Sequence, residues 1–267
     1  MAKRVDEIEK FYKPIDYCGK VVNISFWISV VFSLILPNLA TFTDNFIIQD
    51  IVKILFILTV LIHAIATYIN KLYFIPTADS YRRKQLLSNA FDIPIIPEET
   101  LGYYNNSIEP SYKRLAVNVL ENAFFSNKVC NEMGKKLRII IPVYFLIWFF
   151  IIFHRKSDLN LILILTQIIF SSNILYDWIN IEILRYKNKN VFNQLYSLLL
   201  QKNNLSTPVD IVRILDIFVY YESSKALASL KQSSKIFFKI NHDLSSEWNK
   251  VKHKLNLDGT DEIKNNP

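Results

Sequence analysis

Glycine and cysteine are scarce in this sequence, which has four glycines and two cysteines among 267 residues. So few glycines exclude the glycine-rich loops with which many nucleotide-binding folds surround phosphate groups. Cys18 and Cys130 stand alone, which excludes a disulfide framework and the paired cysteines of a structural zinc site. The sequence also has no HExxH, CxxC or GxSxG motif. We therefore expect a protein that is not an enzyme and has no catalytic residue, metal site or cofactor.

Apolar residues, in contrast, make up 51% of the chain and gather in four long runs. A helix needs about 20 apolar residues to cross a hydrocarbon layer, and about 17 suffice. The third run is shorter, but Lys135, Lys136 and Arg138 just before it can extend their charged ends to the membrane surface. We predict an all-α membrane protein with four transmembrane helices at residues 21–40, 51–69, 139–153 and 159–179. A buried helical hairpin in place of the last two spans is the alternative.

The distribution of lysine and arginine predicts the orientation of these spans. Residues 1–20 carry five of them, residues 71–138 carry ten and residues 185–267 carry thirteen, whereas the 38–50 connection has none. Basic segments stay in the cytoplasm, so both termini and the central insert are expected there. The expected parts are an amphipathic cytoplasmic segment (1–20), a transmembrane hairpin (21–69), a helical cytoplasmic insert (70–138), a second transmembrane hairpin (139–180) and a helical cytoplasmic tail (181–267).

Helical spacing of apolar residues continues outside the spans. In the insert, Pro76 and Thr77 are expected to start a new helix, and a second helix follows the proline-rich 92–102 connection. In the tail, the helix of span four is expected to run on, and Pro208 is expected to start a helix within a helical tail that reaches about Leu255. The predicted buried faces contain Leu86, Leu87, Ala90, Phe91, Leu115, Val119, Leu120 and Phe124 in the insert.

Polar residues inside the spans are the first candidates for function. Span four carries a stripe at increments of 7, 4 and 3, formed by Thr166, Asn173, Asp177 and Asn180. Such a stripe can line water in an oligomeric pore, or it can form hydrogen bonds between packed helices. Span two contains His63, and span one carries Ser25, Ser29 and Ser33 on one face. An intramembrane histidine is a functional candidate, although a lone one more often serves helix packing.

The basic residues of the soluble segments alternate with acidic residues and form no long basic tract. Proteins that bind nucleic acids through their own surface usually concentrate lysine and arginine on one face. The net charge of +7 is therefore explained by basic cytoplasmic loops. We expect no direct sequence-specific binding of nucleic acid.

Three short motifs accompany this arrangement of spans: "YRRKQLLSNAFD", ending at Phe91 and Asp92; "GYYNN" at residues 102–106; and "ENAFFSNKV" ahead of the third span. With the four-span layout, they make the chain resemble the SLATT-type membrane effectors of bacterial antiphage defence. The resemblance implies an effector that forms homo-oligomers in the bilayer of the bacterial inner membrane and permeabilises it, causing abortive infection. It also implies an upstream sensor complex, either a reverse transcriptase with its RNA–DNA product or a nucleotide-signalling system.

On this interpretation the insert and tail would form a cytoplasmic cap that senses the trigger. Its candidate regulatory surface consists of Arg82, Arg83, Lys84, Tyr103, Tyr104 and Asn105. The alternative is a capped helix whose basic residues lie near anionic headgroups, joined to an ordinary packed loop. For the whole chain, the alternatives are a non-enzymatic membrane scaffold or regulatory subunit, a small channel or transporter, and a membrane enzyme.

Overall fold

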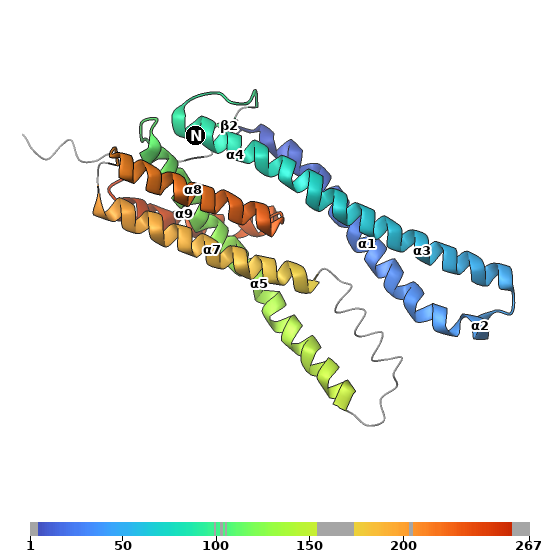
Figure 1. Cartoon of the computed structure of the whole chain (residues 1–267). Helices are drawn as coiled ribbons and strands as arrows, with labels where there is room; N and C mark the ends of the chain where they lie inside the picture. The colour runs from blue at the N-terminus through green and yellow to red at the C-terminus, as the bar shows by residue number, and fades with distance from the viewer. Residues whose placement is uncertain are drawn as a thin grey trace, which may run out of the picture. The chain divides into compact units, whose positions relative to one another are not determined.

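The computed structural model describes residues 5–98, 100–101, 104, 106–153, 174–202 and 205–257. The described chain is almost entirely helical (Figure 1). It divides into two units. We call them the apolar unit (Phe11–Pro76 and Lys136–Ile179) and the packed unit (Met1–Lys10, Thr77–Lys135 and Asn180–Pro267). The all-α prediction is confirmed at this level, and each unit is described by itself below.

The apolar unit contains a helical hairpin built from α1 (Lys13–Ile35) and α3 (Phe46–Ile69). The 3₁₀ turns η1 (Glu7–Tyr12) and η2 (Leu36–Asn38) and the short α2 (Leu39–Phe42) extend α1 at its two ends. Asn45 caps α3, because its side chain accepts a hydrogen bond from the Ile47 backbone N–H at 3.0 Å. α1 therefore begins well before residue 21, and residues 13–20 are part of the same helix as the expected first span.

Among the described residues, three helical stretches are long and apolar enough to cross a membrane: Glu7–Phe42, Phe46–Phe91 and Tyr112–Phe153. In the most apolar part of Phe46–Phe91 no residue is buried within the chain, and few are buried in the other two. Apolar side chains left uncovered along a whole helix are typical of helices that face lipid or other transmembrane helices. These three stretches thus identify the chain as a membrane protein. Of the fourth expected span, residues 159–179, positions 159–173 lie outside the described residues.

Helix α3 does not end where the insert was expected to begin. It passes through a π-helical turn, η3 (Asn70–Phe74), directly into α4 (Ile75–Phe91). The expected helix start at Pro76 and Thr77 is therefore wrong. A proline inside an α-helix clashes with the carbonyl four residues earlier and lacks an N–H. The π turn widens the helix just upstream, which accommodates Pro76 without a break.

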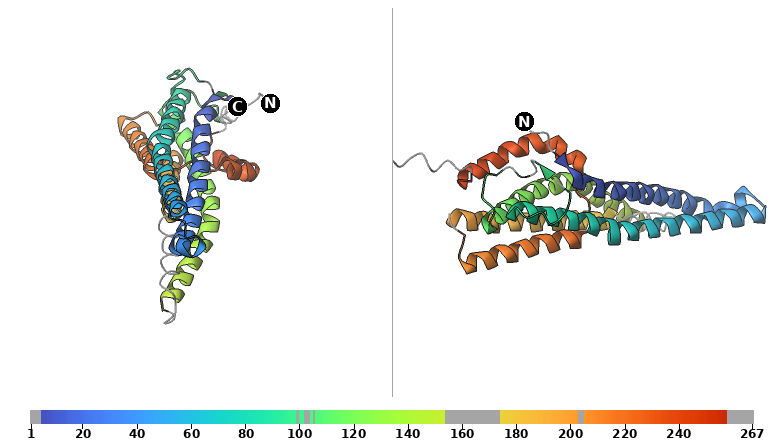
Figure 2. Two further views of the ribbon diagram at one scale, coloured as in Figure 1. Left: turned by 90° about the vertical axis from the view of Figure 1, so that its right-hand side faces the viewer. Right: turned by 90° about the horizontal axis from the view of Figure 1, so that it is seen from above.

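The packed unit is a bundle of α4, the first half of α5 (Tyr112–Phe153), α7 (Ile174–Gln201), α8 (Pro208–Ala228) and α9 (Ser234–Lys254). In both views of Figure 2, α8 and α9 lie on opposite sides of α5. The predicted faces of the insert meet the tail helices in one core. This core includes Leu86, Ala90, Leu115, Val119, Leu120, Phe124, Leu195, Ile214, Tyr221 and Trp248. The insert therefore packs on the tail helices within the chain.

From Pro208 to Lys254 the tail forms two helices, α8 and α9. Thr207 caps α8 by accepting a hydrogen bond from the Asp210 backbone N–H at 3.2 Å, as the Pro208 signal predicted. α8 ends at Ser229, whose φ of 42° is left-handed. The chain then extends for a few residues until Ser233 caps α9 by accepting from the Ile236 N–H at 3.3 Å. The expected helical tail to about Leu255 is thus divided at Ser229, because a left-handed residue stops a helix.

The N-terminal residues join the packed unit through a short backbone ladder. β1 (Val5–Asp6) pairs antiparallel with β2 (Thr100–Leu101). Lys10 Nζ forms an ion pair with Glu98 Oε1 at 3.1 Å. These contacts tie the beginning of the chain to the connection between α4 and α5.

Candidate functional site

One polar contact joins α1 and α3 in the apolar unit. His63 Nδ1 lies 3.1 Å from the Val22 carbonyl oxygen and 3.4 Å from Ser25 Oγ. A carbonyl oxygen can only accept, so Nδ1 carries the proton and donates to Val22. The Ser25 hydroxyl donates to the Val21 carbonyl at 2.8 Å. Nδ1 is thus satisfied by the neighbouring helix, which is the arrangement expected for helix packing.

The other two serines of span one bond within their own helix. Ser29 donates to the Ser25 carbonyl at 2.9 Å, and Ser33 donates to the Val30 carbonyl at 2.8 Å. Such bonds keep a hydroxyl satisfied where water is excluded. Ser25 is the member of the stripe that also contacts α3.

The π turn carries a charged residue toward α7 within the apolar unit. Lys71 Nζ lies 3.9 Å from Asp177 Oδ1 and 4.0 Å from the centre of the Tyr176 ring. The Asp177 side chain remains 52% exposed despite this pair. Thr166 and Asn173 lie outside the described residues, so their place relative to Asp177 is not given. Asn180 is half-buried on α7 and belongs to the packed unit.

About three helical turns beyond Lys71, the same helix carries a buried charged cluster in the packed unit. Arg82 Nη2 forms an ion pair with Glu222 Oε2 of α8 at 2.7 Å, and Arg82 Nε lies 3.7 Å from Asp79 Oδ1. Arg82 and Lys225 both lie against the ring of Tyr221, each 5.7 Å from its centre. These contacts attach α4 to α8.

Burial also shifts the titration of two groups near this cluster. Burial, followed by the nearby charge of Arg82, lowers the pKa of Lys225 to about 8. Burial raises the pKa of Cys130 on α5 to about 11. The Cys130 thiol lies beside Ser126, whose hydroxyl accepts hydrogen bonds from Asn188 and Gln232. A thiol with so high a pKa is protonated at neutral pH and therefore a weak nucleophile.

The second part of the candidate regulatory surface is tied to α5. The Tyr104 hydroxyl accepts a hydrogen bond from the Asn122 amide at 2.8 Å. Asn106 donates to Asn118, which in turn donates to Asn89, both at 2.8 Å. Tyr103 and Asn105 lie outside the described residues. Tyr104 and Asn106 are half-buried, whereas Arg83 and Lys84 on α4 are exposed.

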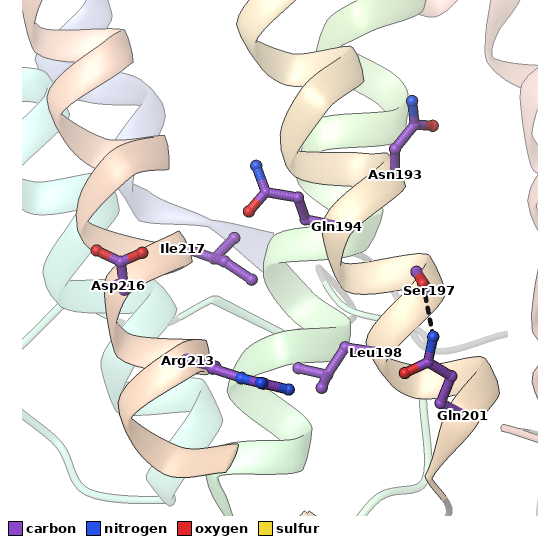
Figure 3. A pocket seen from close by; sticks show the side chains of 8 residues that line it. All are labelled: Asn193, Gln194, Ser197, Leu198, Gln201, Arg213, Asp216 and Ile217. Carbon is purple, nitrogen blue, oxygen red and sulfur yellow. Dashed lines mark hydrogen bonds between the residues drawn. The ribbon is translucent and has the colours of Figure 1, made fainter. Parts of the chain in front are cut away.

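An open groove of about 490 Å³ runs between α7 and α8 in the packed unit (Figure 3). Arg213 extends from α8 toward Leu198 of α7, and Gln201 donates to Ser197 at 3.2 Å along the α7 wall. Asp216 lies on the outer side of α8 (Figure 3). The lining is Asn193, Gln194, Ser197, Leu198, Gln201, Arg213, Asp216 and Ile217. Amides, a hydroxyl and one pair of opposite charges suit contact with polar side chains.

Within the described parts of the chain, no group of three or more histidine, cysteine or acidic side chains could hold a metal ion. The arrangement instead offers ion pairs and hydrogen bonds between helices. No family model, curated protein or solved structure matches the chain. The resemblance to SLATT-type effectors thus stays a hypothesis that rests on the sequence.

Sequence reasoning missed Lys71, Glu222 and Lys225. Lys71 had a usable signal, because it and Asp177 both lie at the expected cytoplasmic ends of their spans. Glu222 had none, since it lies far from Arg82 in sequence and was read as one of many tail charges. The i,i+3 spacing of Asp79 and Arg82 was visible, but it does not show that both become buried.

Proposed function

We propose that the chain is a membrane effector of bacterial antiphage defence. It spans the inner membrane four times with both termini in the cytoplasm, assembles with further copies and permeabilises the membrane when triggered. The observation that carries this proposal is the Lys71–Asp177 pair, in which the Asp177 carboxylate stays half exposed among apolar helices. An ionised carboxylate near hydrocarbon requires polar partners or water. Several copies that bring such pairs together would enclose a water-lined path.

The continuous helix from α3 to α4 supplies a route from trigger to pore. Its first part lies in the apolar unit, and its end is attached to α8 by the Arg82–Glu222 pair. The exposed Arg83 and Lys84 are the contact candidates on α4. The partner is an upstream sensor, either a reverse transcriptase bound to RNA and DNA or a nucleotide-signalling system.

The test is membrane potential and growth after induced expression in bacteria. Wild type is compared with Asp177→Asn and Lys71→Gln. Asp50→Asn is the matched control, because Asp50 forms a 3.0 Å ion pair with Lys53 near the other end of the same hairpin. We expect wild type and Asp50→Asn to depolarise cells and both pair variants to lose at least 10-fold of the effect. The charge exchange Lys71→Asp with Asp177→Lys should restore part of it.

A scaffold or regulatory subunit is the competing function, and the Ser25–His63 contact favours it because that contact serves helix packing. It predicts that no variant changes membrane potential. If wild type is harmless alone, the same comparison is repeated with the genomic neighbours under phage challenge. An intact membrane under those conditions would refute the effector and leave the scaffold.

A further inference from the structure

Helix α9 has a basic face on the outside of the packed unit. Its inner face, with Leu244 and Trp248, is buried in the core. Figure 2 shows α9 at the margin of its bundle, on the far side of α5 from α8. The outer face carries exposed basic side chains at helical spacing: Lys235, Lys239, His242, Lys250 and His253. We name the beginning of this face the α9 patch; it consists of Lys235, Phe238 and Lys239.

The two lysines of the α9 patch are unpaired. Within the part of the chain that the structure describes, neither Lys235 nor Lys239 takes part in an ion pair. The acidic Glu247 of the same helix pairs with Lys128 of α5 at 2.6 Å instead. Lysine in the first turn of a helix is also disfavoured by the helix dipole, so the stability of α9 does not account for Lys235. The patch therefore offers two positive charges to an anionic ligand.

Phe238 places an apolar ring beside these charges. Its side chain is 67% exposed, whereas the neighbouring Phe237 is half-buried. Aromatic and basic side chains together are typical of segments that bind the surface of a membrane, where the ring enters the headgroup layer and the cations meet phosphates. A small soluble anion would use the lysines but gain nothing from the ring.

The segment just before α9 contacts the part of α5 that leads into the membrane. The Gln232 amide donates to Ser126 of α5. The Ser233 N–H donates to Met133 Sδ at 3.5 Å. α5 then continues without a break into its apolar run, which begins at Ile139, six residues or about 9 Å beyond Met133. The headgroup layer is roughly 5–8 Å thick, and lysine side chains extend toward it, so the start of α9 is close enough for contact.

We propose that the α9 patch binds the phosphate groups of anionic phospholipids in the membrane that the chain itself spans. Lys235 and Lys239 form ion pairs with the phosphates, and Phe238 enters the headgroup layer beside them. The proposal requires a membrane protein but not a defence effector, so it holds or fails independently of the proposed function.

Fluorescence quenching in lipid nanodiscs tests this contact with the full chain. A dye is attached to Ser234→Cys, an exposed position next to Lys235, in a Cys18→Ser background that leaves only the buried Cys130. The nanodiscs contain phosphatidylcholine alone or mixed with phosphatidylglycerol, and both kinds include a lipid with a spin label on its headgroup. We expect at least twofold stronger quenching in the anionic nanodiscs. High salt should reduce this gain, because it screens exposed charges.

Two matched double variants assign the gain to the patch. Lys235→Gln with Lys239→Gln should abolish it, whereas Lys235→Arg with Lys239→Arg should keep it. Lys250→Gln with Lys254→Gln removes the same charge from exposed positions at the other end of α9 and should leave the gain unchanged. Phe238→Ala should weaken quenching in both kinds of nanodisc.

Three outcomes would overturn the proposal. The first is equal quenching with and without phosphatidylglycerol, and the second is an equal loss from the two glutamine double variants. The third is binding of a single-stranded RNA oligonucleotide that depends on Lys235 and Lys239, with no effect of phosphatidylglycerol, because RNA is the other polyanion that stacks on aromatic rings between lysines. Quenching needs no depolarisation, so its failure is distinguishable from failure of the proposed function.

Discussion

The two units of the chain treat their apolar and polar side chains in opposite ways. The packed unit buries Leu86, Leu115 and Leu120 completely and pairs the buried Glu222 with Arg82. The apolar unit leaves its large apolar side chains exposed along α1 and α3 and has few polar contacts. Burial of apolar surface from water drives the first kind of folding. In lipid that force is absent between helices, so packing and hydrogen bonds hold the second kind. The comparison predicts that equivalent changes have unequal effects in the two units.

The largest effect is expected from the buried pair in the packed unit. Glu222→Ala should lower its free energy of unfolding by about 1–3 kcal/mol, because the largely buried Arg82 guanidinium loses a carboxylate 2.7 Å away and keeps the more distant Asp79 at 3.7 Å. The readout is the labelling rate of buried Cys130 by a thiol reagent across a urea series, in a Cys18→Ser background. Arg82→Ala with Glu222→Ala should cost less than the sum of the single changes.

The control for this prediction is Lys84→Ala, which removes an exposed charge from the same helix and should change the unfolding free energy by less than about 0.5 kcal/mol. Equal effects of Glu222→Ala and Lys84→Ala would show that the packed unit does not depend on its buried pair. The contrast between the two units would then rest on apolar packing alone.

Sequence alone predicted those parts of the fold that depend on local pattern. The apolar face of the insert, with Leu115 and Leu120, followed from helical periodicity, and the cap at Thr207 followed from the residues around it. The continuous helix through Pro76 could not be predicted, because a π turn at Asn70–Phe74 depends on how the whole helix packs. The break at Ser229 was equally hidden, since serine has no special preference for a left-handed backbone.

The candidate site was predicted only where a residue type is unusual in its setting. His63 and Asp177 were identified because ionisable groups are costly in a membrane, but their partners Val22 and Lys71 come from neighbouring helices. Local pattern gives no information on which helices become neighbours. For the same reason, Arg82 was identified as a basic surface residue although Glu222 buries it in an ion pair.

A change of pH is expected to have an effect of intermediate size. It should be confined to the packed unit, because Lys225 and Cys130 both lie there. Folding lowers the pKa of Lys225 to about 8, so between pH 8 and 10.5 the unfolded chain binds more protons and stability rises with pH. Folding raises the pKa of Cys130 from 9.0 to about 11. Between pH 9 and 11 the folded chain therefore binds more protons than the unfolded chain, and stability falls as pH rises. The two opposing trends overlap above pH 9. The free energy of unfolding of wild type should therefore rise by up to about 1 kcal/mol between pH 8 and 9 and then stay level.

Two variants separate these contributions in urea unfolding followed by pulse proteolysis, with fragments assigned by mass spectrometry. Cys130→Ala should extend the rise beyond pH 9. Lys225→Met should remove the rise and leave the fall. If both variants only shift the plot of unfolding free energy against pH and leave its shape unchanged, the expected opposing titrations of Lys225 and Cys130 are contradicted.

The smallest effect is expected in the apolar unit, at the contact between α1 and α3. Ser25→Ala removes a hydroxyl 3.4 Å from His63 Nδ1, yet His63 keeps its 3.1 Å bond to the Val22 carbonyl. Hydrogen bonds between transmembrane helices contribute about 0.6 kcal/mol on average, so Ser25→Ala should cost about that much in bicelles. Thr59→Ala is the matched control, because Thr59 donates to Leu55 of its own helix at 2.8 Å, and it should cost almost nothing. A loss of several kcal/mol from Ser25→Ala would mean that the apolar unit, like the packed unit, depends on a buried polar contact, and the contrast between them would fail.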